Sequence, residues 1–202
     1  NDATPGRRQL IPPNYTEVAG ELFYNTVSWF RAEAGAFRAE NLSRSLGDEN
    51  LVARDDLGYS GRISFRPKKQ WDLDLSFNGF FGASVFGAGD FQMYNGFAGL
   101  GWLDRAAFLL EAAYLNMDPS TSKESINTGA NLWYKATNWL YPYVRFERTN
   151  TSTSSNRWIE NSAVAGAHFY PLPFVEIRPE YRYRTTEDWL MGHYTVQLHL
   201  FD

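Results

Sequence analysis

Residues 175–184 decide the fold, and they read Val175-Glu176-Ile177-Arg178-Pro179-Glu180-Tyr181-Arg182-Tyr183-Arg184. The odd-numbered positions are apolar or aromatic, and all five even-numbered positions are charged. Successive side chains of a β-strand point to opposite faces, so this alternation predicts a strand with one apolar and one charged face.

The same alternation recurs along the chain and predicts an all-β protein of about eleven strands. Segments 31–37 and 106–114 also have helical propensity, but the spacing of their neighbours leaves room only for hairpin arms. The expected strands are 17–26, 29–41, 55–66, 71–83, 93–103, 106–117, 126–137, 139–149, 159–170, 174–185 and 191–201.

The composition excludes several classes of protein. The 202 residues include no Cys, which rules out disulfides and thiolate metal sites. A net charge of −4 gives no reason to expect nucleic-acid binding. No stretch without a charged residue exceeds 15 residues, and one of that length, 75–89, contains four Gly and is too short for a transmembrane helix. A membrane protein built of strands remains compatible with the chain, 17% of which is aromatic.

The connectors suggest an up-and-down meander with short turns at one end and longer loops at the other. Short connectors are expected at 66–70, 103–105, 137–138 and 171–173, and longer ones at 43–54, 85–92, 118–125 and 150–157. In outer-membrane barrels the short turns face the periplasm and the long loops face outward.

Strand length and aromatic placement favour a transmembrane barrel over a soluble β-domain. Most of the expected strands have 10 to 13 residues, which suits a tilted strand that crosses a bilayer. Trp and Tyr collect near strand ends, where interfacial girdles lie. We therefore expect an antiparallel transmembrane β-barrel in the bacterial outer membrane, with its apolar face toward lipid and its charged face toward the lumen.

Several short motifs follow one another along the chain, at 20–24, 56–67, 108–114, 141–147 and 194–201. Their order resembles the C-terminal part of the phosphate-selective porin (porin O/P-like) family of Gram-negative bacteria. The resemblance implies an outer-membrane channel. The chain departs from the family in continuing past Phe201 to Asp202 and in having only four Lys. No phosphate-binding residue is therefore carried over from the family.

The topology predicts that further strands complete the barrel. If the last strand ends at the periplasm, counting backwards places residues 1–16 in an extracellular loop or N-terminal segment, before a barrel domain at 17–202. A single-chain barrel has an even number of strands. The sheet is thus expected to be part of a larger barrel, or else 9–14 forms a twelfth strand despite Pro12 and Pro13.

The charged face supplies the candidate pore-lining residues. Rows of opposite charge on paired strands either form ion pairs that stabilise the wall or set up a field that ranks ions by charge. Because acidic and basic side chains alternate, a general hydrophilic pore is better supported than an anion filter. The candidates are Arg178, Arg182, Arg184, Glu176, Glu180, Arg145, Glu147, Arg62, Arg66, Glu111 and Lys135.

We therefore predict a porin-like channel for passive diffusion of small hydrophilic or ionic solutes, with no cofactor and no enzymatic activity. Its partners would be outer-membrane lipid, the solutes, and a homo-oligomer or a barrel-associated protein. Three His and no recognisable catalytic motif argue against catalysis, which would need folding to bring Ser162 or Ser76 close to His168. The alternatives are a structural barrel that anchors or sheathes a partner protein, and a soluble carbohydrate-binding β-domain.

Overall fold

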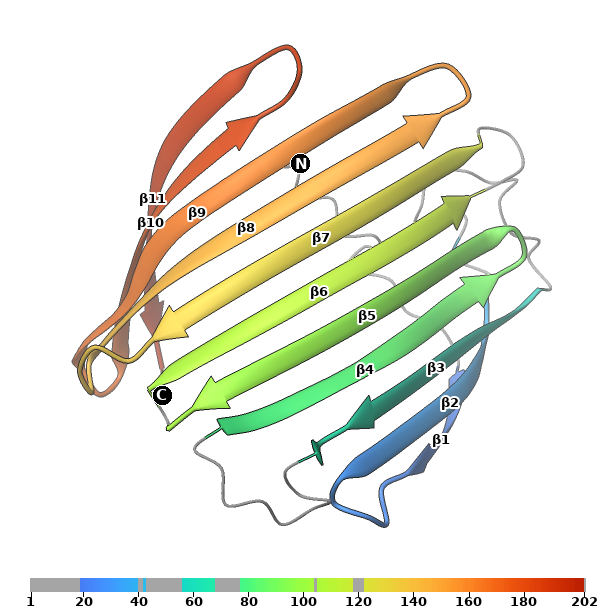
Figure 1. The fold of residues 1–202 in the computed structure, drawn as a ribbon, viewed down its shortest axis with the longest axis horizontal. Coiled ribbons are helices and arrows are strands. Elements are labelled where there is room, and N and C mark those ends of the chain that lie inside the picture. Colours follow the sequence, from blue (N-terminus) through green and yellow to red (C-terminus); the bar gives the residue numbers. More distant parts are fainter. Residues whose placement is uncertain are drawn as a thin grey trace.

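A computed structural model of the chain describes residues 19–39, 42, 56–67, 77–103, 105–117 and 122–201. These residues form one sheet of eleven strands in which each strand pairs only with its sequence neighbours, always antiparallel (Figure 1). The strands are β1 (Ala19–Tyr24), β2 (Phe30–Arg38), β3 (Leu57–Phe65), β4 (Phe77–Ala88), β5 (Phe91–Trp102), β6 (Ala106–Met117), β7 (Lys123–Tyr134), β8 (Leu140–Thr153), β9 (Arg157–Leu172), β10 (Val175–Thr185) and β11 (Leu190–Leu200).

The eleven predicted strands and their up-and-down order are confirmed. The two segments with helical propensity form β2 and β6, because each of them pairs along its length with two neighbouring strands. No helix long and apolar enough to cross a membrane occurs among the described residues.

The prediction of long loops at 85–92 and 150–157 is wrong, because the chain forms a tight hairpin at each of these places. Only Gly89 and Asp90 separate β4 from β5, and the positive φ of Gly89 (52°) suits that turn. Only residues 154–156 separate β8 from β9, since the polar run that begins at Asn150 continues the ladder as far as Thr153. Near Thr153 both faces of β8 are polar, so the alternation of apolar and polar residues is lost although the hydrogen bonding between strands continues.

The remaining connector predictions are tested only in part. The short connector expected at 103–105 agrees with the structure, since β5 ends at Trp102 and β6 begins at Ala106. The loop expected at 43–54, most of the turn expected at 66–70 and the start of the strand expected at 71–83 lie outside the described residues. Among the connectors between described strands, length does not distinguish the two ends of the sheet.

The two faces of the sheet differ sharply in burial. On β10 the charged residues Glu176, Arg182 and Arg184 are buried, whereas Tyr181 and Tyr183 on the opposite face are exposed. The pairing register extends these faces from strand to strand. We call the crowded face, which carries the β10 charges, the inner face, and the opposite one the outer face.

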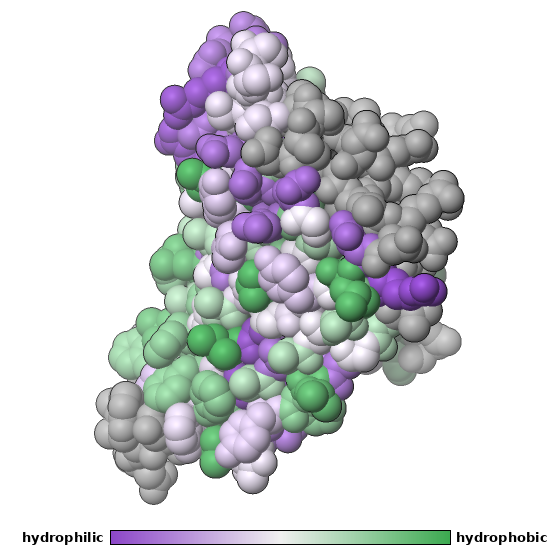
Figure 2. All heavy atoms as spheres, turned by 90° about the vertical axis from the view of Figure 1, so that its right-hand side faces the viewer, coloured by the Kyte–Doolittle hydropathy of each residue, from purple (hydrophilic) through white to green (hydrophobic). Residues whose placement is uncertain are grey.

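The outer face is a band of exposed apolar side chains bordered by aromatic rings. At the end that contains the β1–β2, β3–β4 and β5–β6 connections, ring pairs include Trp29–Phe65 and Phe77–Trp102, with centroids 5.3 and 6.4 Å apart. Toward the other end the outer face becomes polar, for example at Arg148. Figure 2, which views the molecule from the right-hand side of Figure 1, shows hydrophobic residues mainly in the lower part and hydrophilic ones toward the top, where Figure 1 places the β8–β9 hairpin.

The inner face is polar only in part, whereas the sequence predicts a charged face toward the lumen. Around the β4–β5 hairpin it carries an apolar cluster in which Phe37 stacks on Phe86 and Phe86 meets Phe91 edge-on. The buried members of this cluster are Phe37, Ala39, Leu42, Ala88, Phe91 and Leu115. The sequence does not reveal this apolar cluster, because β4 and β6 have apolar residues on both faces.

Candidate functional site: the charged inner wall

The register of β8, β9 and β10 brings the charged rows onto one wall. Arg182 pairs with Val164, which pairs in turn with Arg145, so the three side chains share a face. Two residues further along, the same rule aligns Arg184, Ser162 and Glu147. The charged rows on 139–149 and 174–185 therefore meet across the small side chains of β9. The prediction that these two rows lie on directly paired strands is wrong, because β9 separates β8 from β10.

At the centre of this wall, Arg182 lies between two carboxylates. Its Nη2 is 3.1 Å from Glu180 Oε1 and its Nη1 is 3.8 Å from Glu147 Oε2. The Tyr143 hydroxyl donates a hydrogen bond of 2.8 Å to Glu180 Oε2. Arg145 Nε lies 2.8 Å from Glu147 Oε1. Only 3% of the Arg182 side chain is exposed, so its charge is neutralised within the wall.

A second group of interacting side chains surrounds Glu176, near the start of β10. Arg178 donates to Glu176 Oε1 from both Nε and Nη2, at 3.2 and 3.1 Å. His168 Nδ1 contacts the same carboxylate oxygen. The Arg178 side chain keeps 29% of its surface exposed, which leaves it the more accessible of the two arginines Arg178 and Arg182.

The third group was only half predicted. Arg184 Nε lies 3.9 Å from Glu160 Oε1, and both side chains are almost fully buried. Glu160 was missed because the sequence around it shows no alternation of charge. One indication was present in the sequence: Glu160 and Ser162 occupy alternate positions of the same predicted strand, so both face inward.

The remaining candidates are spread over the other strands. Arg62 lies over the Phe97 ring, 4.8 Å from its centroid, and Glu111 accepts a 2.7 Å hydrogen bond from Asn95 Nδ2. Arg66 lies just beyond β3, where its backbone N–H donates to the Trp29 carbonyl. None of these residues belongs to the network of β8–β10.

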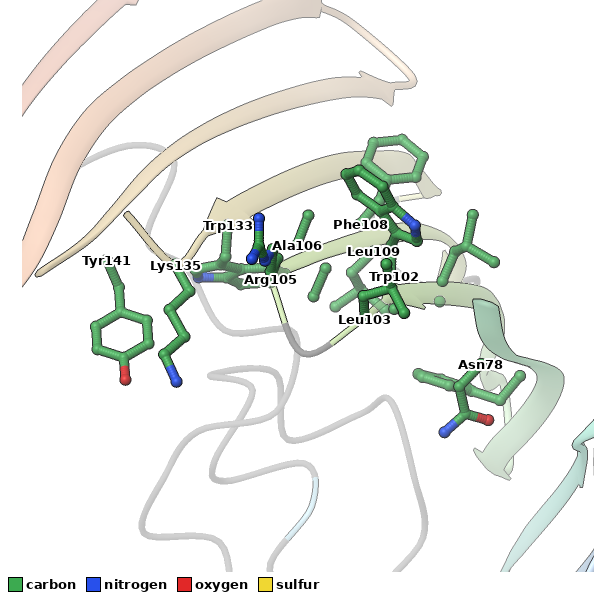
Figure 3. Close-up of a pocket in the computed structure, with 15 residues that line it drawn as sticks. Asn78, Trp102, Leu103, Arg105, Ala106, Phe108, Leu109, Trp133, Lys135 and Tyr141 are labelled. Atoms are coloured by element: carbon green, nitrogen blue, oxygen red, sulfur yellow. The ribbon is translucent and has the colours of Figure 1, made fainter. Parts of the chain in front are cut away.

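Lys135 lies at the rim of the sheet, beside a hollow of about 730 Å³ (Figure 3). Arg105, Trp133 and Tyr141 line the same hollow. The Lys135 backbone N–H donates to the Arg105 carbonyl at 2.6 Å, which fixes the two residues opposite each other, just before β6 and just after β7.

Within the described residues, the polar groups of the wall show no catalytic or metal-binding arrangement. His168 contacts Glu176 rather than a serine, and Ser162 lies six residues away on the same strand, about 20 Å. Ser76 lies outside the described residues. No group of three or more His, Asp or Glu suited to a metal ion occurs in the part of the chain that is described.

Solved structures with a similar fold come from bacterial outer-membrane proteins. The outer-membrane expressed OmpT of Vibrio cholerae superposes with a TM-score of 0.57 at 10% identity, over 83% of this chain and 54% of that one. OmpT of the same organism, folded in vitro and in a trimer form, gives 0.58 at 8% identity, over 90% and 64%. The siderophore receptor PirA from Pseudomonas aeruginosa gives 0.52 at 12% identity, over 89% and 36%. The fold is that of an outer-membrane β-barrel.

This fold explains why the exposed face is the apolar one. In an outer-membrane barrel the outward side chains meet lipid and the inward ones are polar, as on β8–β10. The bacterial outer membrane expected from the sequence agrees with this fold. The chain spans between about a third and two thirds of the length of these three structures. No family model matches the chain, and no curated protein matches it, so the porin O/P resemblance is not supported by either comparison.

Proposed function

We propose that the chain forms the wall of a porin-like channel through which small hydrophilic or ionic solutes diffuse passively. The observation that carries this proposal is the ionic wall of β8–β10, which is turned away from the apolar outer face. Charged side chains are costly against lipid, so they line a water-filled lumen in this class of fold. The outer face supplies the contact with membrane lipid, and association of barrels into an oligomer is a further proposal.

The pairing within the wall favours weak ion selectivity. Arg182 and Arg184 are buried against carboxylates, so their fields are largely cancelled. Arg178 and Arg145 keep more than a quarter of their side chains exposed and remain able to meet a passing ion. A general hydrophilic pore is therefore better supported than the phosphate selectivity that the porin O/P resemblance implies.

Conductance in planar lipid bilayers tests the proposal. The protein should produce discrete conductance steps in KCl with a small reversal potential in a salt gradient. Replacing Arg178 and Arg182 with Gln should move the reversal potential toward cation preference, with most of the change due to Arg178. The matched control is Arg157→Gln, because Arg157 is exposed and bonded to Asn150 near the β8–β9 turn, away from these arginines. Absence of any conductance step from correctly folded protein would refute the channel.

A structural barrel that holds a partner protein is a second candidate function. The apolar inner cluster around Phe91 favours it, since a water-filled lumen gives no reason to place aromatic rings inward. A plugged barrel would conduct only after its partner was stripped by denaturant and the barrel refolded. The soluble carbohydrate-binding alternative is disfavoured, because its dry core would have to be formed by the face that is exposed here.

A further inference from the structure

Two basic residues occupy opposed backbone positions at the rim hollow. Ala106 pairs with Tyr134, and the Lys135 N–H bonds to the Arg105 carbonyl, so Arg105 and Lys135 occupy directly opposed positions on neighbouring strands. Side chains in such positions have Cβ atoms about 5 Å apart, and like charges there repel each other. Both residues follow the inner-face parity of Ala107 and Trp133.

Neither cation is neutralised by the rest of the described chain. Every ion pair identified among the described residues involves other basic side chains, on β2, β8, β9 and β10. This contrasts with the ionic wall, where each arginine has a carboxylate partner. An anion placed between Arg105 and Lys135 would relieve their repulsion and accept charge-assisted hydrogen bonds from both.

The hollow beside the cations offers room and an apolar surface. On the inner face, Gly101 and Ala107 pair with each other, and neither has a side chain large enough to fill the space. Trp133 and Tyr141 contribute aromatic rings, and Asn78 lies on the far side (Figure 3). A volume of about 730 Å³ falls in the range of pockets that take small organic molecules and is far larger than an inorganic ion needs.

We propose that this rim hollow binds small ring-bearing carboxylates at one mouth of the barrel. The carboxylate lies between Arg105 and Lys135, and the ring lies against Trp133 and Tyr141 over the floor made by Gly101 and Ala107. The mouth position rests on the proposed channel, and there the site would concentrate such solutes before they enter. Binding itself does not depend on conduction.

Isothermal titration calorimetry of the folded protein in detergent micelles tests the site, with benzoate as the probe. Protein-free micelles correct for partitioning of the probe. Acetate keeps the charge without the ring, and benzyl alcohol keeps the ring without the charge, so both should bind at least about tenfold more weakly than benzoate. Equal affinity for acetate and benzoate would overturn the proposal, because the ring would then contribute nothing.

Three variants locate the site. Arg105→Gln and Lys135→Gln should each weaken benzoate binding about tenfold, which is what the loss of one charged hydrogen bond costs. Ala107→Phe should abolish binding by filling the hollow, while Arg157→Gln should leave it unchanged. Wild-type affinity in both Gln variants would overturn the site. Bilayer conductance is measured separately: binding without conductance would refute only the channel, and conductance without binding would refute only the site.

Discussion

Leu110→Arg tests which face of the sheet meets lipid. Leu110 lies on the outer face of β6 with 45% of its surface exposed. It is midway between Ala106, which pairs with Trp102, and Tyr114, whose ring stacks on Tyr94 with centroids 6.4 Å apart. Four residues of a strand tilted by about 40° rise about 10 Å along the membrane normal. Leu110 is therefore near the middle of the apolar band.

An Arg at the bilayer midplane of a barrel costs about 2–4 kcal/mol of folding free energy, and this cost falls toward zero at the interfaces. A loss of that size lowers the folding equilibrium constant roughly 30- to 1,000-fold. If the outer face were instead in water, the substitution would replace an exposed side chain, and its effect would stay within about 0.5 kcal/mol.

The matched control is Asn95→Arg on the neighbouring strand. Asn95 faces inward and donates to Glu111, so an Arg there gains a carboxylate partner and should change stability by less than about 1 kcal/mol. Both variants are refolded into phospholipid vesicles, and urea unfolding is followed by tryptophan fluorescence. If Leu110→Arg proved harmless while Asn95→Arg was strongly destabilising, the assignment of the two faces would be reversed.

Two further predictions concern the sheet itself. A Cβ at Gly82 would lie 2.2 Å from the Ile63 carbonyl oxygen, whereas one at Gly96 would have nothing within 4 Å. Gly82→Ala should therefore cost about 1–3 kcal/mol in the same urea assay, and Gly96→Ala should be neutral or slightly stabilising. Equal stability of the two variants would contradict this contact. For the sheet edges, the double variant Leu22→Cys/Val196→Cys should form no intramolecular disulfide, whereas the registered pair Tyr181→Cys/Tyr194→Cys should form one. The chain has no native Cys to interfere, and a rapid Leu22–Val196 cross-link would show that the edges meet directly.

The sequence was sufficient for the strands because their outer faces obey one strong rule. Lipid requires an apolar side chain at every second position, and on β10 the inner positions are all charged, so the period of two is unmistakable. The rule weakens where the strands leave the apolar band, and there the boundaries at Ala88 and Thr153 were missed. Beyond the band, hydrogen bonding between neighbouring strands determines where a strand ends, and composition does not report it.

The charged inner wall was predictable as a set of residues but not as a set of interactions. Parity alone placed Arg178 and Arg182 on the charged face of one strand and Glu147 on the charged face of another. Which arginine is buried depends on the register between β8, β9 and β10, and on the small side chains of β9 that let Arg182 reach Glu147. Pairing across strands involves residues far apart in the chain, so the contact of Glu160 with Arg184 and the apolar cluster around Phe91 could not be found from local patterns.

The pairing of the two edge strands, β1 and β11, determines how the sheet closes into a barrel. No pairing joins β1 to β11 among the described strands, and their outer side chains are very exposed, with Leu22 and Tyr194 both at 81%. Unpaired backbone groups cannot face hydrocarbon, so both edges must be hydrogen-bonded in a bilayer. Strands β1 and β11 run in the same direction, because an antiparallel meander reverses ten times between them. Direct closure would therefore create a parallel pair, whereas an odd number of further strands restores antiparallel pairing throughout. We propose the second arrangement, a larger barrel with an even number of strands, for which the Leu22–Val196 cross-link is the decisive measurement.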